Sequence, residues 1–178
     1  MAIFLPGKFL HLGTPRCAST ATHRALRTLP GIKEFHQHMD LKEMIRYQHG
    51  PYRGELAFAT VRNPYDVLVT WFIRMHSSIR AMSFLDFVTS YQNKDLERDG
   101  RLFFTCVDGV EVMRYETLQV DFDAMLAKIG LEPIQLERHN PTEIKKPWRT
   151  YYDEEILVAV NERFGHEFDR YGYERLEP

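Results

Sequence analysis

The chain has 178 residues, of which 44% are hydrophobic, 13% are aromatic and 27% are charged. These values are typical of a globular protein with one core, so we expect a single domain over residues 1–178. Lysine and arginine number 23 against 25 aspartates and glutamates, which gives a formal net charge of −2. Because the chain has no global positive field, we expect no nucleic-acid partner.

The cysteines and the N-terminal residues indicate a cellular compartment. Cys17 and Cys106 lie far apart and form no CxxC pair, and MAIFLPGKFLHLG lacks the basic start, long apolar core and cleavage site of a leader. No apolar run reaches the roughly 20 residues that cross a bilayer. We therefore expect a reduced, cytoplasmic protein with no membrane anchor in this chain.

The first half of the chain alternates predicted strands and helices. Residues 8–12 are almost continuously apolar, which favours a central strand, and a turn and a helix over residues 19–29 follow. Residues 32–37 predict a second strand, and Asp40 is expected to cap a short helix over residues 41–47. Residues 56–61 predict a buried strand, after which Asn63 and Pro64 predict a helix start.

The second half contains further helices and one hairpin signal. A short helix is predicted over residues 83–91. Asp108-Gly109 favours a hairpin between residues 102–107 and 110–115, although the second arm can instead belong to the main sheet. Asp121 is expected to cap a helix that ends at Gly130, and Asp153 a last helix that ends at Gly165.

This order of elements predicts an α/β fold, a three-layer sandwich with a central, mostly parallel sheet. Ligands of such sheets bind beyond the carboxyl ends of the strands. Arg16, His38 and Arg62 each follow a predicted strand, so they can gather at one edge of the sheet.

The stretch from the first predicted strand into the first helix favours anion binding. Small and hydroxyl side chains, Ala18 to Thr22, stand at the predicted helix start, where backbone N–H groups and the helix dipole attract negative charge. Arg16 adds a full positive charge beside them. An ordinary strand-to-helix turn with hydroxyl caps remains the alternative for this stretch.

Two segments resemble motifs of the P-loop-like sulfotransferases, which use 3′-phosphoadenosine-5′-phosphosulfate (PAPS). TPRCASTAT, residues 14–22, resembles their 5′-phosphosulfate loop, P-K/R-x-G/A-S/T-T. ATVRNPYDVLVTWF, residues 59–72, resembles their 3′-phosphate motif, an Arg at a strand end and a Ser eight residues later, here Arg62 and Thr70. MRYETL, residues 113–118, and the tail from residue 140 to 173 resemble other segments of the family.

The resemblance implies a fold like that of the P-loop nucleotide hydrolases, and it implies site residues. Arg16 would contact the oxygen between sulfur and the 5′-phosphate, and Arg62 and Thr70 would hold the 3′-phosphate. Lys146 and Arg149, with Lys145, can close over that phosphate or simply be solvated. The 5′-phosphosulfate would lie on the backbone N–H groups and hydroxyls of Cys17, Ala18, Ser19, Thr20 and Ala21.

The sequence departs from the common family pattern at three positions. Arg16 stands where many members have Lys, which keeps the charge but gives no proton donor because guanidinium is effectively never neutral. Ala18 stands where Gly is frequent, so the loop must accommodate a Cβ. Thr70 replaces Ser and keeps the hydroxyl.

The general base is expected to be His38, which matches the position after the second strand where several family members carry a catalytic His. An imidazole suits deprotonation of a hydroxyl near neutral pH. His36 and Glu34 are alternatives, because all three share one strand face. With no third ligand near His36 and His38, we expect no metal.

The sequence therefore predicts a PAPS-dependent sulfotransferase that acts on a hydroxyl of a carbohydrate or a small molecule. One alternative is an inactive domain that binds 3′-phosphoadenosine nucleotides. Another is an ATP-dependent kinase, although the chain lacks G-x-x-x-x-G-K-[ST]. The acceptor and the oligomeric state are not indicated by any motif.

Overall fold

The computed structural model describes residues 1–35, 40–46, 55–75, 82–90, 101–137 and 146–178. It divides into two compact units, each built from two segments of the chain. Unit 1 comprises Met1–Val61 and Phe104–Asn140, and unit 2 comprises Arg62–Phe103 and Pro141–Pro178. Each unit combines two separated stretches of sequence, so a single cut in the chain does not divide the protein into these two units.

Unit 1 contains a five-stranded sheet in the order β3-β1-β2-β4-β5. β2 pairs in parallel with β4, and β4 pairs in parallel with β5, whereas β1 is antiparallel to both β2 and β3. The predicted α/β class is confirmed, with a sheet that is mixed and mostly parallel in its centre. The strands are β1 (Ala2–Leu5), β2 (Phe9–Leu12), β3 (Lys33–Phe35), β4 (Leu56–Val61) and β5 (Val110–Arg114).

β1 was missed by the sequence analysis, and it explains the antiparallel pairs. Lys8 donates its backbone N–H to Leu5 O at 3.0 Å, and Gly7 has φ 75°, so a tight turn folds β1 back along β2. Since β1 reverses direction, β3 runs the same way as β2 and β4. The carboxyl ends of β2, β3 and β4 therefore lie at one edge of the sheet, as predicted.

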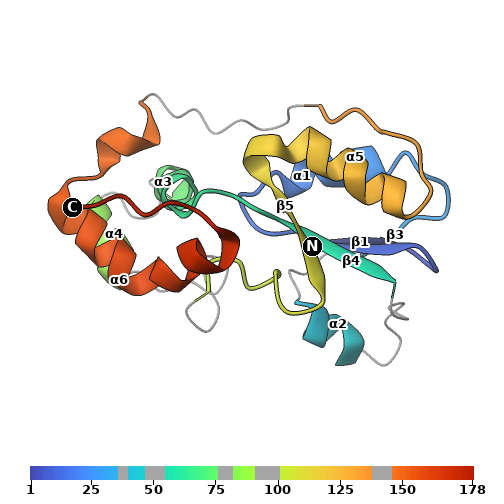
Figure 1. Ribbon diagram of the computed structural model, residues 1–178, viewed down its shortest axis with the longest axis horizontal. Coiled ribbons are helices and arrows are strands. Elements are labelled where there is room, and N and C mark those ends of the chain that lie inside the picture. Colours follow the sequence, from blue (N-terminus) through green and yellow to red (C-terminus); the bar gives the residue numbers. More distant parts are fainter. Residues whose placement is uncertain (36–39, 47–54, 76–81, 91–100, 138–145) are drawn as a thin grey trace. The chain divides into compact units, whose positions relative to one another are not determined.

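Helices cover both faces of the sheet of unit 1. Figure 1 shows α1 (Ser19–Leu26) and α5 (Leu118–Lys128) on one face and α2 (Leu41–Arg46) on the other. A short 3₁₀ helix, η1 (Tyr115–Thr117), leads into α5. The core between the sheet and the first two of these helices consists of Ile3, Phe9, Ala25, Leu26, Phe58, Met113, Phe122, Met125 and Leu126.

Unit 2 is helical in the part of it that is described. α4 (Phe84–Ser90) packs on α6 (Glu154–Tyr171), and α3 (Pro64–Met75) packs on α6 and on the 3₁₀ helix η2 (Trp148–Tyr151). Tyr65 lies at the centre of these contacts, fully buried, with its hydroxyl donating to Asn161 Oδ1 at 2.6 Å. The Leu176 N–H donates to the same hydroxyl at 3.0 Å, which holds the C-terminal residues against α3 and α6.

Most predicted caps are confirmed. Asp40 and Glu43 form a reciprocal capping box at the start of α2, with N···O distances of 2.7 and 2.8 Å. Asn63 Oδ1 accepts the Tyr65 N–H at 3.0 Å at the start of α3. Asp153 Oδ1 accepts the Ile156 N–H at 2.9 Å at the start of α6. Side chains that cap a helix thus set the start of three helices.

Three local predictions were wrong. Residues 102–107 form turns and not a strand, so there is no hairpin at Asp108-Gly109, and residues 110–114 join the main sheet as β5. α5 starts before Asp121, whose carboxylate instead accepts the Arg114 N–H at 2.6 Å. α6 continues through Gly165 to Gly172, which has φ 64° and ends the helix.

The glycine inside α6 has a packing role. A Cβ built on Gly165 would lie 3.0 Å from Nη1 of Arg175, so this position leaves room for the guanidinium of the C-terminal segment. Among the helices that the structure describes, none has the length and apolar character needed to cross a membrane.

Candidate functional site

A tight turn connects β2 to α1. The Cys17 N–H donates to Thr14 O at 3.3 Å, with Pro15 and Arg16 as the two central residues. Arg16 has φ 62°, which together with the preceding proline is the pattern of a type II turn. A residue other than glycine rarely occupies that position, because its Cβ crowds the backbone.

Ala18 has a second left-handed backbone in the same loop. It precedes α1 with φ 59° and ψ 18°, and its carbonyl accepts the Thr22 N–H at 3.2 Å, which starts the helix. The loop thus accommodates the Cβ of Ala18, as predicted, but it does so with a backbone conformation that favours glycine. Two strained residues therefore lie in the predicted anion-binding loop.

Replacing Ala18 by glycine is expected to stabilise the protein. The left-handed backbone costs an alanine about 1 kcal/mol, and the greater freedom of glycine in the unfolded chain offsets part of that gain, so we expect a net gain of about 0.5 kcal/mol. Urea unfolding of Ala18→Gly against wild type measures the difference. Ala25→Gly, inside α1, is the control and should destabilise by at least about 1 kcal/mol, because it loses a buried methyl group as well as helix propensity. A loss of stability in Ala18→Gly would contradict this interpretation.

The loop is tied to another part of unit 1 by its threonine. The Thr14 hydroxyl lies 2.6 Å from the Thr105 hydroxyl and 3.8 Å from Cys106 Sγ, and both threonines are at most 1% exposed. A short hydrogen bond in a buried position is well protected from water. The turn after β2 is therefore held against the segment that precedes β5.

The residues predicted for the 5′-phosphosulfate lie together at the start of α1. Ser19 and Thr20 are partly exposed, Cys17 is buried and Arg16 is partly exposed. The first turn of α1 contains no acidic residue, so no side chain of that turn offsets the positive end of the helix dipole. The dipole itself favours an anion over a cation at this end.

The second strand-turn-helix places Arg62 directly after β4. Its Nε donates to Asp66 Oδ2 at 2.8 Å, and its Nη2 lies 2.7 Å from the same oxygen. The two side chains are only 12% and 16% exposed. Asp66 was missed as a partner of Arg62, although an acid four residues after an arginine at a helix start is a recognisable signal.

The other residues predicted for the 3′-phosphate differ in exposure. Thr70 is 1% exposed, and within the described part of the chain its hydroxyl has no hydrogen-bond partner. A ligand reaches this hydroxyl only if the surroundings of α3 rearrange. Lys146 and Arg149 are exposed, and the Arg149 guanidinium lies 5.0 Å from the centre of the Trp148 ring.

Aromatic contacts join Arg149 to the helix that follows Arg62. The ring of Trp148 stacks on Tyr65 with their centres 5.5 Å apart, and Tyr152 donates its hydroxyl to Tyr65 O at 2.7 Å. Burial, followed by the charges of Tyr65 and Asp66, raises the pKa of Tyr152 well above its ordinary value, so its phenol remains a donor. Unit 2 thus brings η2 and the start of α3 together.

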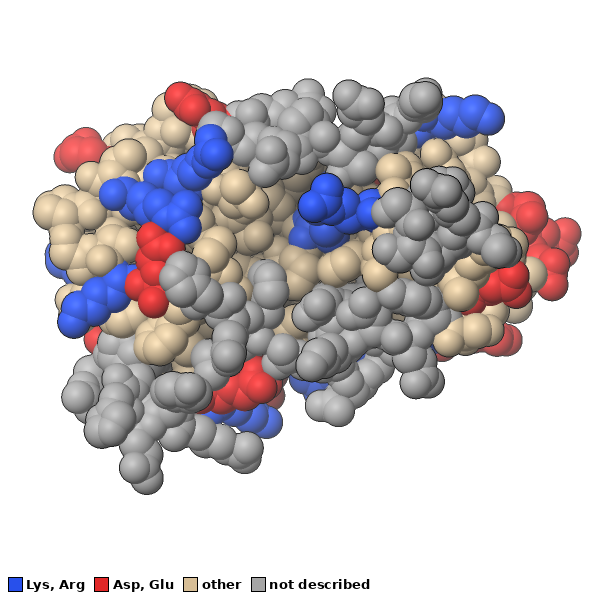
Figure 2. All heavy atoms as spheres, turned by 180° about the vertical axis from the view of Figure 1, so that it is seen from behind, with Lys and Arg blue, Asp and Glu red and all other residues tan. Residues whose placement is uncertain are grey.

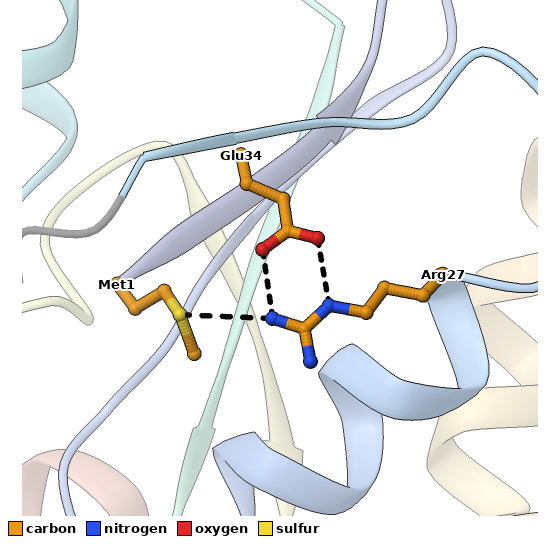
Figure 3. Close-up of polar contacts among 3 residues, drawn as sticks. All are labelled: Met1, Arg27 and Glu34. Carbon is orange, nitrogen blue, oxygen red and sulfur yellow. Dashed lines mark hydrogen bonds and ion pairs between the residues drawn. The ribbon is translucent and has the colours of Figure 1, made fainter.

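Of the three residues considered as the general base, the structure describes only Glu34. His36 and His38 lie outside the described residues. Glu34, on β3, accepts from Arg27 through both oxygens, with Nε···Oε1 and Nη2···Oε2 distances of 2.7 Å (Figure 3). This bond to Glu34 raises the pKa of Arg27. Since both oxygens accept from a guanidinium, the pairing argues against Glu34 as a proton acceptor.

Two buried histidines lie on the strand and the helix that the predicted anion-binding loop connects. His11 on β2 and His23 on α1 are both 0% exposed, with their rings edge to face and their centres 4.8 Å apart. Burial lowers the pKa of His11 well below its ordinary value, and His23 and the chain N-terminus lower it further. The apolar pattern of residues 8–12 predicted a strand but gave no sign of this pair.

The charges of the described residues are mixed. On the face drawn in Figure 2, lysines and arginines lie in several separate groups, some of them beside acidic side chains. No group of three or more metal-ligating side chains occurs among the residues with described positions. On the part of this face formed by described residues, the charged side chains therefore do not gather into one patch of a single sign.

The structure defines an α/β protein in which two neighbouring parallel strands each lead through a short arginine-containing connection into a helix. It places Arg16 and the residues 17–21 in unit 1, and Arg62, Thr70, Lys146 and Arg149 in unit 2. Comparison with protein-family models, with curated proteins and with solved structures found no match.

Proposed function

We propose that the chain is a sulfotransferase that moves a sulfuryl group from PAPS to a hydroxyl of a carbohydrate or a small molecule. The observation that carries the proposal is the pair of strand-turn-helix segments. β2 pairs in parallel with β4, Arg16 lies in the turn after β2, and Arg62 directly follows β4. A helix start that follows the carboxyl end of a parallel strand suits a phosphate group, and PAPS carries one at its 3′ position besides its 5′-phosphosulfate.

The start of α1 would hold the 5′-phosphosulfate. The backbone N–H groups and hydroxyls there neutralise the outer sulfate oxygens, and no acidic side chain in that turn opposes them. Arg16 would stabilise the charge that develops on the leaving phosphate. Because its guanidinium does not give up a proton, its contribution is electrostatic.

The reaction is an in-line transfer. The acceptor oxygen forms a bond to sulfur while the bond between sulfur and the 5′-phosphate oxygen breaks, which leaves 3′-phosphoadenosine-5′-phosphate (PAP). The hydroxyl proton passes to a base, for which His38 remains our proposal. In this proposal the sheet is the core of a fold like that of the P-loop nucleotide hydrolases, and no metal takes part.

The same nucleotide-binding features also suit, in part, two other functions. An inactive domain would keep the nucleotide contacts without transfer. An ATP-dependent kinase would need a lysine for the outer phosphates and a metal-binding hydroxyl, and the turn TPRCAST has neither the glycines nor the lysine of that motif. The sulfotransferase is favoured over the kinase by the arginine that follows β4, which suits a second, separate phosphate.

The proposal predicts selective stabilisation by PAP. At a concentration about 100 times its dissociation constant, PAP should stabilise the folded protein by about 2.7 kcal/mol, which raises Tm by roughly 5 to 11 °C. ATP with Mg²⁺ should give a smaller shift, because it lacks the 3′-phosphate. Differential scanning fluorimetry with both ligands measures the shifts. Equal or greater stabilisation by ATP would exclude the sulfotransferase.

A transfer assay separates the sulfotransferase from an inactive binding domain. Labelled PAPS is incubated with a panel of sugars and phenols, and the label in each acceptor is counted. Transfer to any acceptor supports the enzyme. Binding of PAP without transfer to a broad panel would support the inactive domain.

A further inference from the structure

Asp66 restricts the side chain of Arg62. One oxygen of Asp66, Oδ2, contacts both Nε and Nη2, at 2.8 and 2.7 Å, and both side chains are largely removed from solvent. At such a position solvent screens the pair less than it screens an exposed one. A planar guanidinium held at two nitrogens has little freedom to rotate.

The geometry of the guanidinium then decides which of its edges can meet a ligand. The group has five N–H donors in one plane. Asp66 lies at the edge formed by Nε and Nη2. The adjacent edge, formed by the two terminal nitrogens, is the one whose two N–H groups match two oxygens of a phosphate.

Asp66 itself is on a well-fixed part of α3. Asn63 accepts the Tyr65 N–H with its side chain and the Val67 N–H with its carbonyl, both at 3.0 Å. Tyr65 is fully buried, and its hydroxyl is bonded to Asn161. Both sequence neighbours of Asp66, Tyr65 and Val67, are therefore fixed by hydrogen bonds in the first turn of the helix.

We propose that Asp66 is a positioning residue that orients Arg62 toward the 3′-phosphate of a nucleotide. The carboxylate offsets part of the positive charge of Arg62, but it fixes the guanidinium before the ligand arrives, which lowers the entropy lost on binding. Asp66 thereby sets the preference for a nucleotide with a 3′-phosphate over one without it. The inference rests on the function proposed above.

The test compares PAP with adenosine 5′-phosphate, which lacks the 3′-phosphate. Isothermal titration calorimetry gives both dissociation constants, and their ratio is the preference. Wild type should prefer PAP, and Arg62→Ala should lose that preference. We expect Asp66→Ala to lower the preference about tenfold, as the loss of an ordered charge-assisted contact would. Asp66→Asn should keep it within about threefold, because the amide oxygen can still accept from both nitrogens.

Matched variants separate orientation from helix stability. Asp86→Ala removes the first-turn acid of α4, which binds Ser83 rather than an arginine, and it should leave the preference unchanged. The double variant Arg62→Ala, Asp66→Ala should behave like Arg62→Ala alone. If Asp66→Ala does not fold, Asp66→Ser replaces it, since serine is well tolerated at a helix start but too short to hold both nitrogens.

The outcomes distinguish the two proposals. If Asp66→Ala keeps the wild-type preference, or if Asp66→Asn loses as much as Asp66→Ala, then Asp66 does not position Arg62, whereas the wild-type preference for PAP still supports the proposed function. If wild type binds the two nucleotides equally, both proposals are overturned.

Discussion

Replacing Gly13 by alanine is expected to destabilise the protein by about 3 kcal/mol, at the upper end of the cost of forcing extra atoms into a packed site. A Cβ built on Gly13 would lie 2.5 Å from the carbonyl oxygen of Met1 and 2.9 Å from Cε1 of His23. The Gly13 N–H also donates to that carbonyl at 2.9 Å, so the backbone cannot move away without losing a bond.

Urea unfolding of Gly13→Ala against wild type measures the loss, and Gly7→Ala is its control. Gly7 has φ 75° but nothing within 4 Å of an added Cβ, so its replacement should cost only the backbone strain, about 1 kcal/mol. A similar loss in both variants would show that crowding at Gly13 is unimportant. A larger loss in Gly13→Ala would show that the end of β2 is closely packed against β1 and α1.

Acidification should destabilise the protein through His11. Both of its ring nitrogens lie without a hydrogen-bond partner among the described residues, and its neighbours include His23, Phe58 and the chain N-terminus. None of these neighbours carries a negative charge that would stabilise an imidazolium. The folded protein therefore holds His11 neutral at a pH where the unfolded chain accepts a proton.

The sign of the effect follows from the lowered pKa. Above about pH 6.5, the ordinary pKa of histidine, both states are neutral at this position and stability is unaffected. As the pH falls below that value, the unfolded state binds the proton and the folded state does not, so stability decreases. Between pH 7 and pH 5 the loss from one such histidine is about 2 kcal/mol.

His11→Phe should remove this dependence while keeping a ring between β2 and α1. Urea unfolding at pH 7, 6 and 5 gives the free energy of unfolding of both proteins. The difference between wild type and His11→Phe should change by about 2 kcal/mol across that range, because groups that do not interact with His11 contribute equally to both proteins. Parallel pH profiles would show that protonation of His11 does not limit stability.

Local sequence signals predicted most of the elements well. The apolar run of β4 has the predicted limits, and Asn63, Asp40 and Asp153 each start the helix that they were expected to cap. These signals act within a few residues, so the sequence contains all that is needed to interpret them.

Predictions failed where distant contacts decide the structure. Asp108-Gly109 is a strong hairpin signal, but residues 110–114 find a parallel partner in β4, which is far away in the sequence. Gly165 looks like a helix end, and its actual role is to leave space for Arg175. The burial of His11 beside His23 likewise depends on side-chain packing, which no short pattern shows.

The division of each unit between two chain segments affects the order in which the protein can fold during synthesis. β4 emerges from the ribosome long before β5, its parallel partner, since Ala57 pairs with Val110. Until then the edge of β4 is open to pairing with other chains. Unit 2 is likewise incomplete until α6, near the end of the chain, is available to α3 and α4. Completion of both units therefore awaits synthesis of α6, and nascent chains halted between β4 and β5 should be those most dependent on chaperones.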